Sequence, residues 1–189
     1  MGAVSVRRIQ QEYDAVIRWR AYPLHPDIPP AGMDYRSYFG GEAAWASVAE
    51  RLGAMAAMLS LPFNMPKVKY NSRRAEELTA WAVTEVPDAV DSLRTAIFQA
   101  IWADGVDNSD PAALADIADS VDISRDLAMD ALEDRRGRAT VDTDWQDAMA
   151  RRIRGVPVVL IGDQAVTGAQ LWPVFAEALE SAGIRSRDT

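Results

Sequence analysis

Residues 155–170 read GVPVVLIGDQAVTGAQ, and this stretch decides the fold. Within it, residues 156–161 form a short, wholly apolar run that suits a strand buried on both faces. A Gly-Asp turn signal follows, so residues 164–167 are expected to return as the second strand of a hairpin. Pro157 lacks a backbone N–H and belongs at the first residue of a strand. The stretch therefore predicts a β-hairpin with proline at its entrance.

Helical patterns lie on both sides of this hairpin in the sequence. Residues 170–182 have the apolar spacing of a closing helix, and residues 3–13 have that of an opening helix. Residues 15–22, AVIRWRAY, instead alternate between apolar and polar side chains. This alternation predicts a half-buried strand. Residues 23–32 contain four of the ten prolines and are expected to form a stiff loop.

The long central part of the chain is expected to be helical with short breaks. Asp110 before Pro111 is a strong helix start, and Ser124 is a further N-cap candidate. Asp142 or Thr143 is expected to cap the last helix of the block. The predicted helices cover residues 43–59, 72–86, 88–103, 111–120, 124–136 and 143–153.

This order of elements predicts an α/β fold with a large α-helical insertion. The helical block has no linker composition on either side, so it reads as an insertion rather than a separate domain. We expect residues 1–33 and 154–189 to form the α/β domain and residues 34–153 to form the inserted helical domain.

The composition excludes several chemistries. The 189 residues include no cysteine and one histidine, His25, and their net charge is −8. A disulfide framework, a thiolate nucleophile, an iron–sulfur cluster and a multi-histidine metal site are therefore excluded. The acidic balance argues against nucleic acid and anionic lipid as partners. No phosphate-binding loop or cofactor motif is found, and no metal site is expected.

No apolar run is long enough for a membrane span, and the N-terminus has no signal-peptide core. We therefore expect a cytoplasmic protein without a membrane partner.

Three stretches resemble the DsbA family of thioredoxin-like proteins. They are RWRAYPLHPD at 18–27, AIFQAIWADGVDNSDPAALADIA at 96–118, and the hairpin stretch at 155–170. The last is the most specific, because a Val-Pro step into a buried strand followed by Thr-Gly-Ala-Gln is a habit of this family. The closest resemblance is to cytoplasmic oxidoreductases of the FrnE type. Their relatives include 2-hydroxychromene-2-carboxylate isomerases and kappa-class glutathione transferases.

The resemblance implies a thioredoxin-like fold and a substrate site. It implies a cis bond between Val156 and Pro157, which turns the Val156 N–H and C=O outward toward an extended substrate. The implied substrate-binding residues are Val156, Pro157, Thr167, Gly168 and Gln170. The expected partner near Pro157 is a peptide, a thiol or a small aromatic substrate.

Compared with the family, this chain lacks the first strand and the Cys-X-X-Cys motif. In relatives that motif opens the first helix, whose N-terminus lowers the thiol pKa. Gly2 falls about where the second cysteine would be, so no catalytic residue is assigned. The missing strand would pair with both 15–22 and 156–161. We expect a start codon further upstream, a strand from another chain, or direct pairing of these two segments.

Three functions stay open at this point. The first is a disulfide oxidoreductase or isomerase relative without a redox-active cysteine in this chain. The second is a degenerate, non-catalytic thioredoxin-like binding module. The third is a cysteine-independent, glutathione-dependent isomerase or transferase, for which Ser5 is the nearest hydroxyl. The incomplete sheet also predicts a homo-oligomer, since unpaired strand edges recruit partners.

Overall fold

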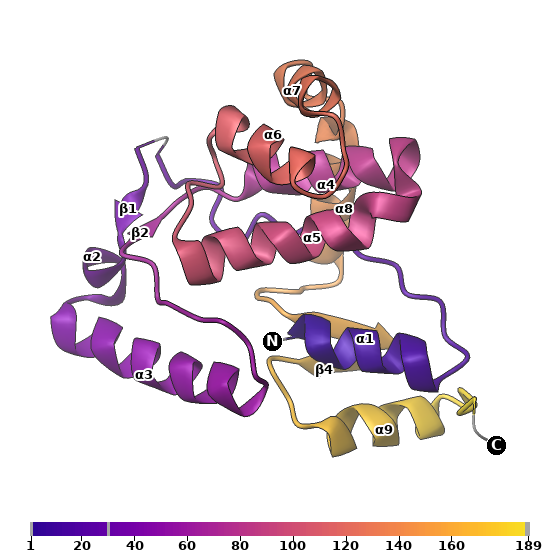
Figure 1. Cartoon of the computed structure of the whole chain (residues 1–189). Helices are drawn as coiled ribbons and strands as arrows, with labels where there is room; N and C mark the ends of the chain where they lie inside the picture. The colour runs from indigo at the N-terminus through magenta and orange to yellow at the C-terminus, as the bar shows by residue number, and fades with distance from the viewer. Residues whose placement is uncertain (1, 30, 188–189) are drawn as a thin grey trace. The chain divides into compact units, whose positions relative to one another are not determined.

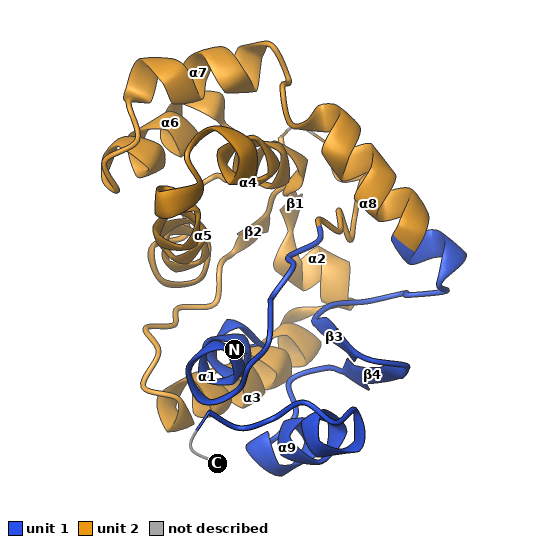
Figure 2. Cartoon of the chain, turned by 90° about the vertical axis from the view of Figure 1, so that its right-hand side faces the viewer, with its two compact units in different colours: residues 1–20, 148–189 blue, residues 21–147 orange. Residues whose placement is uncertain are grey.

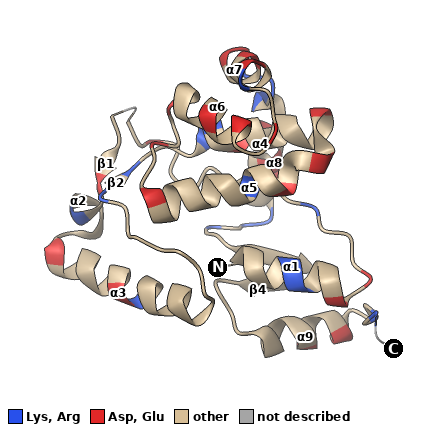
Figure 3. Cartoon of the chain, in the orientation of Figure 1, with Lys and Arg blue, Asp and Glu red and all other residues tan. Residues whose placement is uncertain are grey.

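The computed structural model describes residues 2–29 and 31–187 (Figure 1). The chain divides into two compact units, residues 1–20 with 148–189 and residues 21–147 (Figure 2). We call them unit 1 and unit 2, in that order. Both units carry acidic and basic side chains on their helices (Figure 3). The predicted division at residues 33 and 154 stays a prediction.

Unit 1 is a β-hairpin packed against two helices. The strands β3 (Val158–Ile161) and β4 (Gln164–Thr167) pair antiparallel, with Val159 opposite Val166. The helices are α1 (Gly2–Glu12) and α9 (Trp172–Ser181). These elements share one core, because apolar side chains of α1, both strands and α9 pack together. Its buried members are Ile9, Tyr13, Ile161, Val166, Phe175, Ala178 and Leu179.

Unit 2 is mainly helical. Its helices are α2 (Tyr35–Phe39), α3 (Glu42–Met58), α4 (Arg73–Glu85), α5 (Val90–Gln99), α6 (Pro111–Asp119) and α7 (Arg125–Glu133), together with most of α8 (Arg138–Ala150). A single 3₁₀ turn, η1 (Pro87–Ala89), precedes α5, and a π-helical turn, η2 (Ala100–Asp104), continues it. The strands β1 (Met33–Asp34) and β2 (Val68–Lys69) pair antiparallel and form a short ribbon. The main core is formed by α4 to α7, with Leu78, Leu93, Leu114 and Leu132 among its buried side chains.

Two helix starts in unit 2 confirm the sequence analysis. The Asp110 carboxylate accepts the Ala112 N–H at 3.0 Å, with Pro111 in the first helical position. The Ser124 hydroxyl accepts the Leu127 N–H at 3.5 Å. Both side chains satisfy donors that an uncapped helix would leave open.

The predicted start of the last helix in the central helical block, α8, is wrong. Helix α8 begins at Arg138, so Asp142 and Thr143 lie inside it rather than capping it. The helical hydrogen bonds begin at Gly137, whose carbonyl accepts the Val141 N–H at 3.1 Å. The chain crosses α4 closely at this residue, because a Cβ atom on Gly137 would lie 1.9 Å from the Glu77 carbonyl oxygen, so only glycine fits there.

The predicted strand at 15–22 is also wrong, because these residues form no strand. The alternation predicts that Ile17, Trp19 and Ala21 share the inward face. Ile17 packs against the unit 1 core, together with Ala15, whereas Trp19 is 37% exposed. A strand needs a ladder partner, and among the described residues none pairs with this segment. The Ala21 N–H donates instead to the Asp144 side chain at 2.9 Å. Direct pairing of 15–22 with the hairpin is therefore not observed.

Candidate functional site

The N-terminus of α1 lies on the proline that opens the hairpin. A Cβ atom added to Gly2 would lie 3.0 Å from the Pro157 Cβ and 3.1 Å from its Cγ. The Val156–Pro157 peptide bond is cis, the geometry that the resemblance implies. The first N–H groups of a helix have no partner within the helix and carry partial positive charge. The site therefore combines a helix N-terminus with the entrance of the hairpin.

The other sequence-predicted residues lie directly beside Pro157. The Gly168 N–H donates to the Pro157 carbonyl at 2.8 Å, and Gly168 has a φ of +81° that favours glycine. The Gln170 side-chain amide donates to the Thr167 carbonyl at 2.8 Å. The structure thus brings Pro157, Thr167, Gly168 and Gln170 together. Their role in substrate binding stays a prediction.

Strand β3 has an open edge next to this site. Because residues 157 and 168 are hydrogen-bonded opposite each other, the alternation of an antiparallel ladder turns the N–H and C=O of Val158 and Leu160 away from β4. Within residues 2–29 and 31–187 no strand pairs with that edge. Val156 is 53% exposed and Leu160 is 48% exposed. The edge is therefore both unpaired and apolar.

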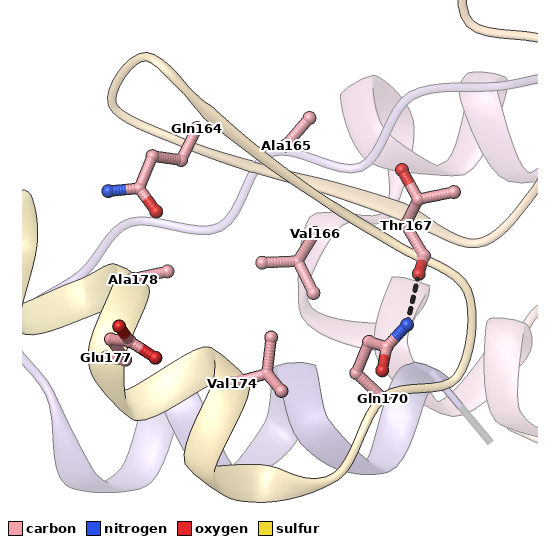
Figure 4. A pocket seen from close by; sticks show the side chains of 8 residues that line it. All are labelled: Gln164, Ala165, Val166, Thr167, Gln170, Val174, Glu177 and Ala178. Atoms are coloured by element: carbon pink, nitrogen blue, oxygen red, sulfur yellow. Dashed lines mark hydrogen bonds between the residues drawn. The ribbon is translucent and has the colours of Figure 1, made fainter.

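A cleft of about 510 Å³ lies between β4 and α9 (Figure 4). Val166 and Ala178 are buried at its floor, and Val174 points into it from α9. Polar residues also line this cleft, and they are Gln164, Thr167, Gln170 and Glu177. The Thr167 side chain points away from α9, and its carbonyl accepts the Gln170 amide (Figure 4).

The sequence does not reveal that residues of α9 line a cleft. The apolar spacing of residues 170–182 predicts a helix with one buried face, but only the packing of that helix on β4 shows that Val174 and Ala178 line a cleft. Glu177 gave no signal in the sequence, because a carboxylate on a helix is usually a solvated residue.

The chemistry available at this site is limited. The chain contains no cysteine. Ser5 lies one turn into α1 and is half-buried rather than presented at the helix start. Across the part of the chain that the structure describes, no cluster of three His, Cys, Asp or Glu side chains could hold a metal ion. What the site offers is backbone hydrogen bonding, apolar surface and the helix N-terminus.

Residues 1–180 match the family of DSBA-like thioredoxin domains. The chain belongs to this family. A comparison with curated proteins gives no match. The prediction of a DsbA-like thioredoxin fold with a helical insertion is thereby confirmed.

Solved structures agree with the DsbA-like fold. A probable DsbA oxidoreductase from Streptomyces coelicolor is 23% identical, with a TM-score of 0.74 over 87% of this chain and 74% of that one. A 2-hydroxychromene-2-carboxylate isomerase is 21% identical, with a TM-score of 0.69 over 94% of this chain and 84% of that one. At these identities the likeness establishes the fold alone. None of the described helices of this DsbA-like chain is long and apolar enough to cross a membrane.

Proposed function

We propose that this DsbA-like chain binds an extended peptide backbone at Val156–Pro157, and that its own residues carry out no thiol–disulfide exchange. The observation that carries the proposal is the packing of the α1 N-terminus on Pro157 beside an exposed Val156, in a chain without cysteine. Glutathione, which has a peptide bond between its cysteine and its glycine, is one source of this backbone chemistry, and a longer peptide is the other.

Backbone pairing is the main attraction in this proposal. No described residue hydrogen-bonds to the Val156 N–H or C=O, so both are available to a ligand. An extended ligand that pairs there continues along the open edge of β3. The main-chain bonds would supply affinity, and exposed Val156 and Leu160 would favour apolar side chains on the ligand.

Any thiol chemistry at this site needs a thiol from outside residues 1–189, because a thiolate is the nucleophile in disulfide exchange. The ligand itself or another chain can supply it. Two similar structures are those of a probable oxidoreductase and of an isomerase, and their activities suggest disulfide-bearing or small aromatic ligands for this site. The proposed compartment is the cytoplasm, as in the relatives that the sequence resembles.

The test is ligand binding with a matched pair of variants. The probes are reduced glutathione and an acetylated, amidated hexapeptide of alternating valine and lysine, whose charge suits a chain of net −8. Val156→Lys places a charge of the same sign as the hexapeptide at the proposed site, and Val16→Lys places the same charge on another exposed valine of unit 1.

Binding of the hexapeptide, measured by isothermal titration calorimetry, should weaken at least tenfold in Val156→Lys and stay unchanged in Val16→Lys. Equal weakening in both variants, or no binding of either probe to the unmodified chain, would contradict the proposal.

A second copy of the chain is the proposed partner of the β3 edge when no ligand is bound. The unpaired N–H and C=O groups of Val158 and Leu160 favour this, since open edges template pairing. Leu160→Lys should then lower the dimer fraction in sedimentation velocity, whereas Leu171→Lys, at an exposed position off the strand, should not. A monomer at all concentrations would rule out this partner.

A further inference from the structure

The only lysines, Lys67 and Lys69, lie two residues apart in different surroundings. Lys67 is exposed, whereas Lys69 is half-buried on β2. Lys69 lies opposite Met33 in the β1–β2 ribbon, and the Tyr35 N–H donates to the Lys67 carbonyl at 2.8 Å. These backbone contacts hold the Lys69 side chain against α2.

Aromatic rings surround the Lys69 amine. Its Nζ lies 4.0 Å from the centre of the Tyr38 ring and 5.5 Å from that of Tyr35. The Tyr38 hydroxyl is hydrogen-bonded to His25 Nε2 at 3.1 Å. Tyr35 is buried, whereas Tyr38 is 37% exposed, so one ring of the group is open to solvent. We call His25, Tyr35, Tyr38 and Lys69 the Lys69 cluster.

No carboxylate among the described residues forms an ion pair with Lys69. Asp34, next to it on the ribbon, caps α2 by accepting the N–H groups of Arg36 and Ser37 at 2.8 and 3.1 Å. The Arg36 side chain pairs with Glu42. The acidic side chains nearest in the sequence to α2 are thus committed to other partners, and the amine faces rings instead.

Burial of the cluster favours the neutral form of each group, and at Lys69 it acts against the attraction of the ring faces for the ammonium ion. Burial lowers the pKa of Lys69 to about 8. Burial and the nearby Lys69 charge lower the pKa of His25. Burial, with a contribution from Tyr38, raises the pKa of Tyr35 to about 12. Near neutral pH the cluster therefore holds a phenol at Tyr35 and an appreciable fraction of unprotonated amine at Lys69.

We propose that Lys69 is a reactive amine that forms an imine with a small aromatic aldehyde. The Nζ lone pair attacks the carbonyl carbon, and the resulting carbinolamine loses its hydroxyl group as water. The amine gives up two hydrogens and the carbonyl oxygen leaves with them, so the products are one imine and one water. In this proposal the Tyr38 hydroxyl, which is hydrogen-bonded to His25 in the structure, supplies the proton to the departing hydroxyl. Its exposed ring favours an aromatic aldehyde by stacking.

The test is site-resolved labelling of the folded chain. Salicylaldehyde with cyanoborohydride at pH 7.5 fixes imines as stable amines, and tandem mass spectrometry separates adducts at Lys67 from those at Lys69. At this pH an amine of pKa 8 is roughly one quarter neutral, against about one thousandth for an ordinary lysine. A less basic amine is also a weaker nucleophile, which offsets part of this difference. We therefore expect Lys69 to be labelled about tenfold faster than Lys67.

Three controls make the result decisive. In guanidinium the ratio should fall to about one, because the cluster is lost. Tyr38→Ser should lower the ratio by opening Lys69 to water, and Tyr38→Phe should slow imine formation without moving its pH midpoint. Labelling of Lys69 no faster than Lys67, or a ratio that survives denaturation, would overturn the proposal. The cluster would then be a cation–π contact that holds β2 on α2.

Discussion

Glu76→Gln is expected to stabilise the chain above pH 7 and to have little effect near pH 4. Glu76 lies on α4, where its Oε1 accepts the Ser72 hydroxyl at 2.7 Å. Its Oε2 is buried without a partner among the described residues. Burial raises the pKa of Glu76 from 4.5 to about 7, and this outweighs the opposing effects of Ser72 and Arg73.

The sign of the effect follows from linkage. The folded chain binds the Glu76 proton more tightly than the unfolded chain does. The resulting stabilisation is fully present below the unfolded pKa of 4.5 and is lost as the pH rises through the folded pKa of about 7. The rise of the pKa from 4.5 to about 7 corresponds to roughly 3 kcal/mol. Glutamine keeps an oxygen for Ser72 and has no charge to bury, so it removes this penalty.

Urea denaturation followed by far-UV circular dichroism at pH 4 and pH 8 measures the effect. The variant should gain up to about 3 kcal/mol over the unmodified chain at pH 8, and close to none at pH 4. Glu85→Gln, an exposed position at the end of the same helix, is the matched control. The reasoning is refuted if Glu76→Gln changes stability equally at both pH values, or if Glu85→Gln behaves in the same way.

Gly137→Ala should destabilise unit 2 by about 3 kcal/mol or more, because the added Cβ would meet backbone atoms of Glu77 on α4; thermal melting checks this, and an unchanged Tm would contradict the tight crossing. Asp110→Ala should cost about 1 kcal/mol in urea denaturation through loss of the α6 cap, and Asp110→Asn should restore most of it. In an insulin-reduction assay with dithiothreitol the chain should add nothing to the uncatalysed rate, and clear turnover would show that the absence of a thiol does not set the chemistry.

The elements with local signals were predictable from the sequence. An apolar run and a Gly-Asp turn encode the β3–β4 hairpin, and their register needs no distant residue. Helices α1 and α9 follow from apolar spacing, and α6 follows from Asp110 and Pro111. In each case the physical cause lies within a few residues of the element.

The errors concern contacts between distant residues. The alternation at 15–22 correctly places Ile17 against the core, but a strand also requires a partner for its backbone. Helix α8 begins where Gly137 crosses α4, a contact between distant residues that no local pattern at Asp142 or Thr143 reveals. The β1–β2 ribbon pairs residues more than thirty positions apart in the sequence. Each of its strands has two residues, which is too short for an alternation of apolar and polar side chains to be recognised.

The candidate site shows the same division. Pro157, Thr167, Gly168 and Gln170 lie within one stretch, so the hairpin alone brings them together. The cleft beside them needs α9, and its residues Val174 and Glu177 emerge only once that helix is placed on β4. The Lys69 cluster depends on three separate segments and was not visible in the sequence.

The central claim is that Val156–Pro157 and the open edge of β3 receive an extended peptide backbone. The most direct test is the ¹⁵N–¹H correlation spectrum of the chain during titration with the valine–lysine hexapeptide. The account predicts that the amide signals of Val156, Val158 and Leu160 shift first and most, with Gly168 following. Shifts centred on other residues, or none at saturating peptide, would contradict it.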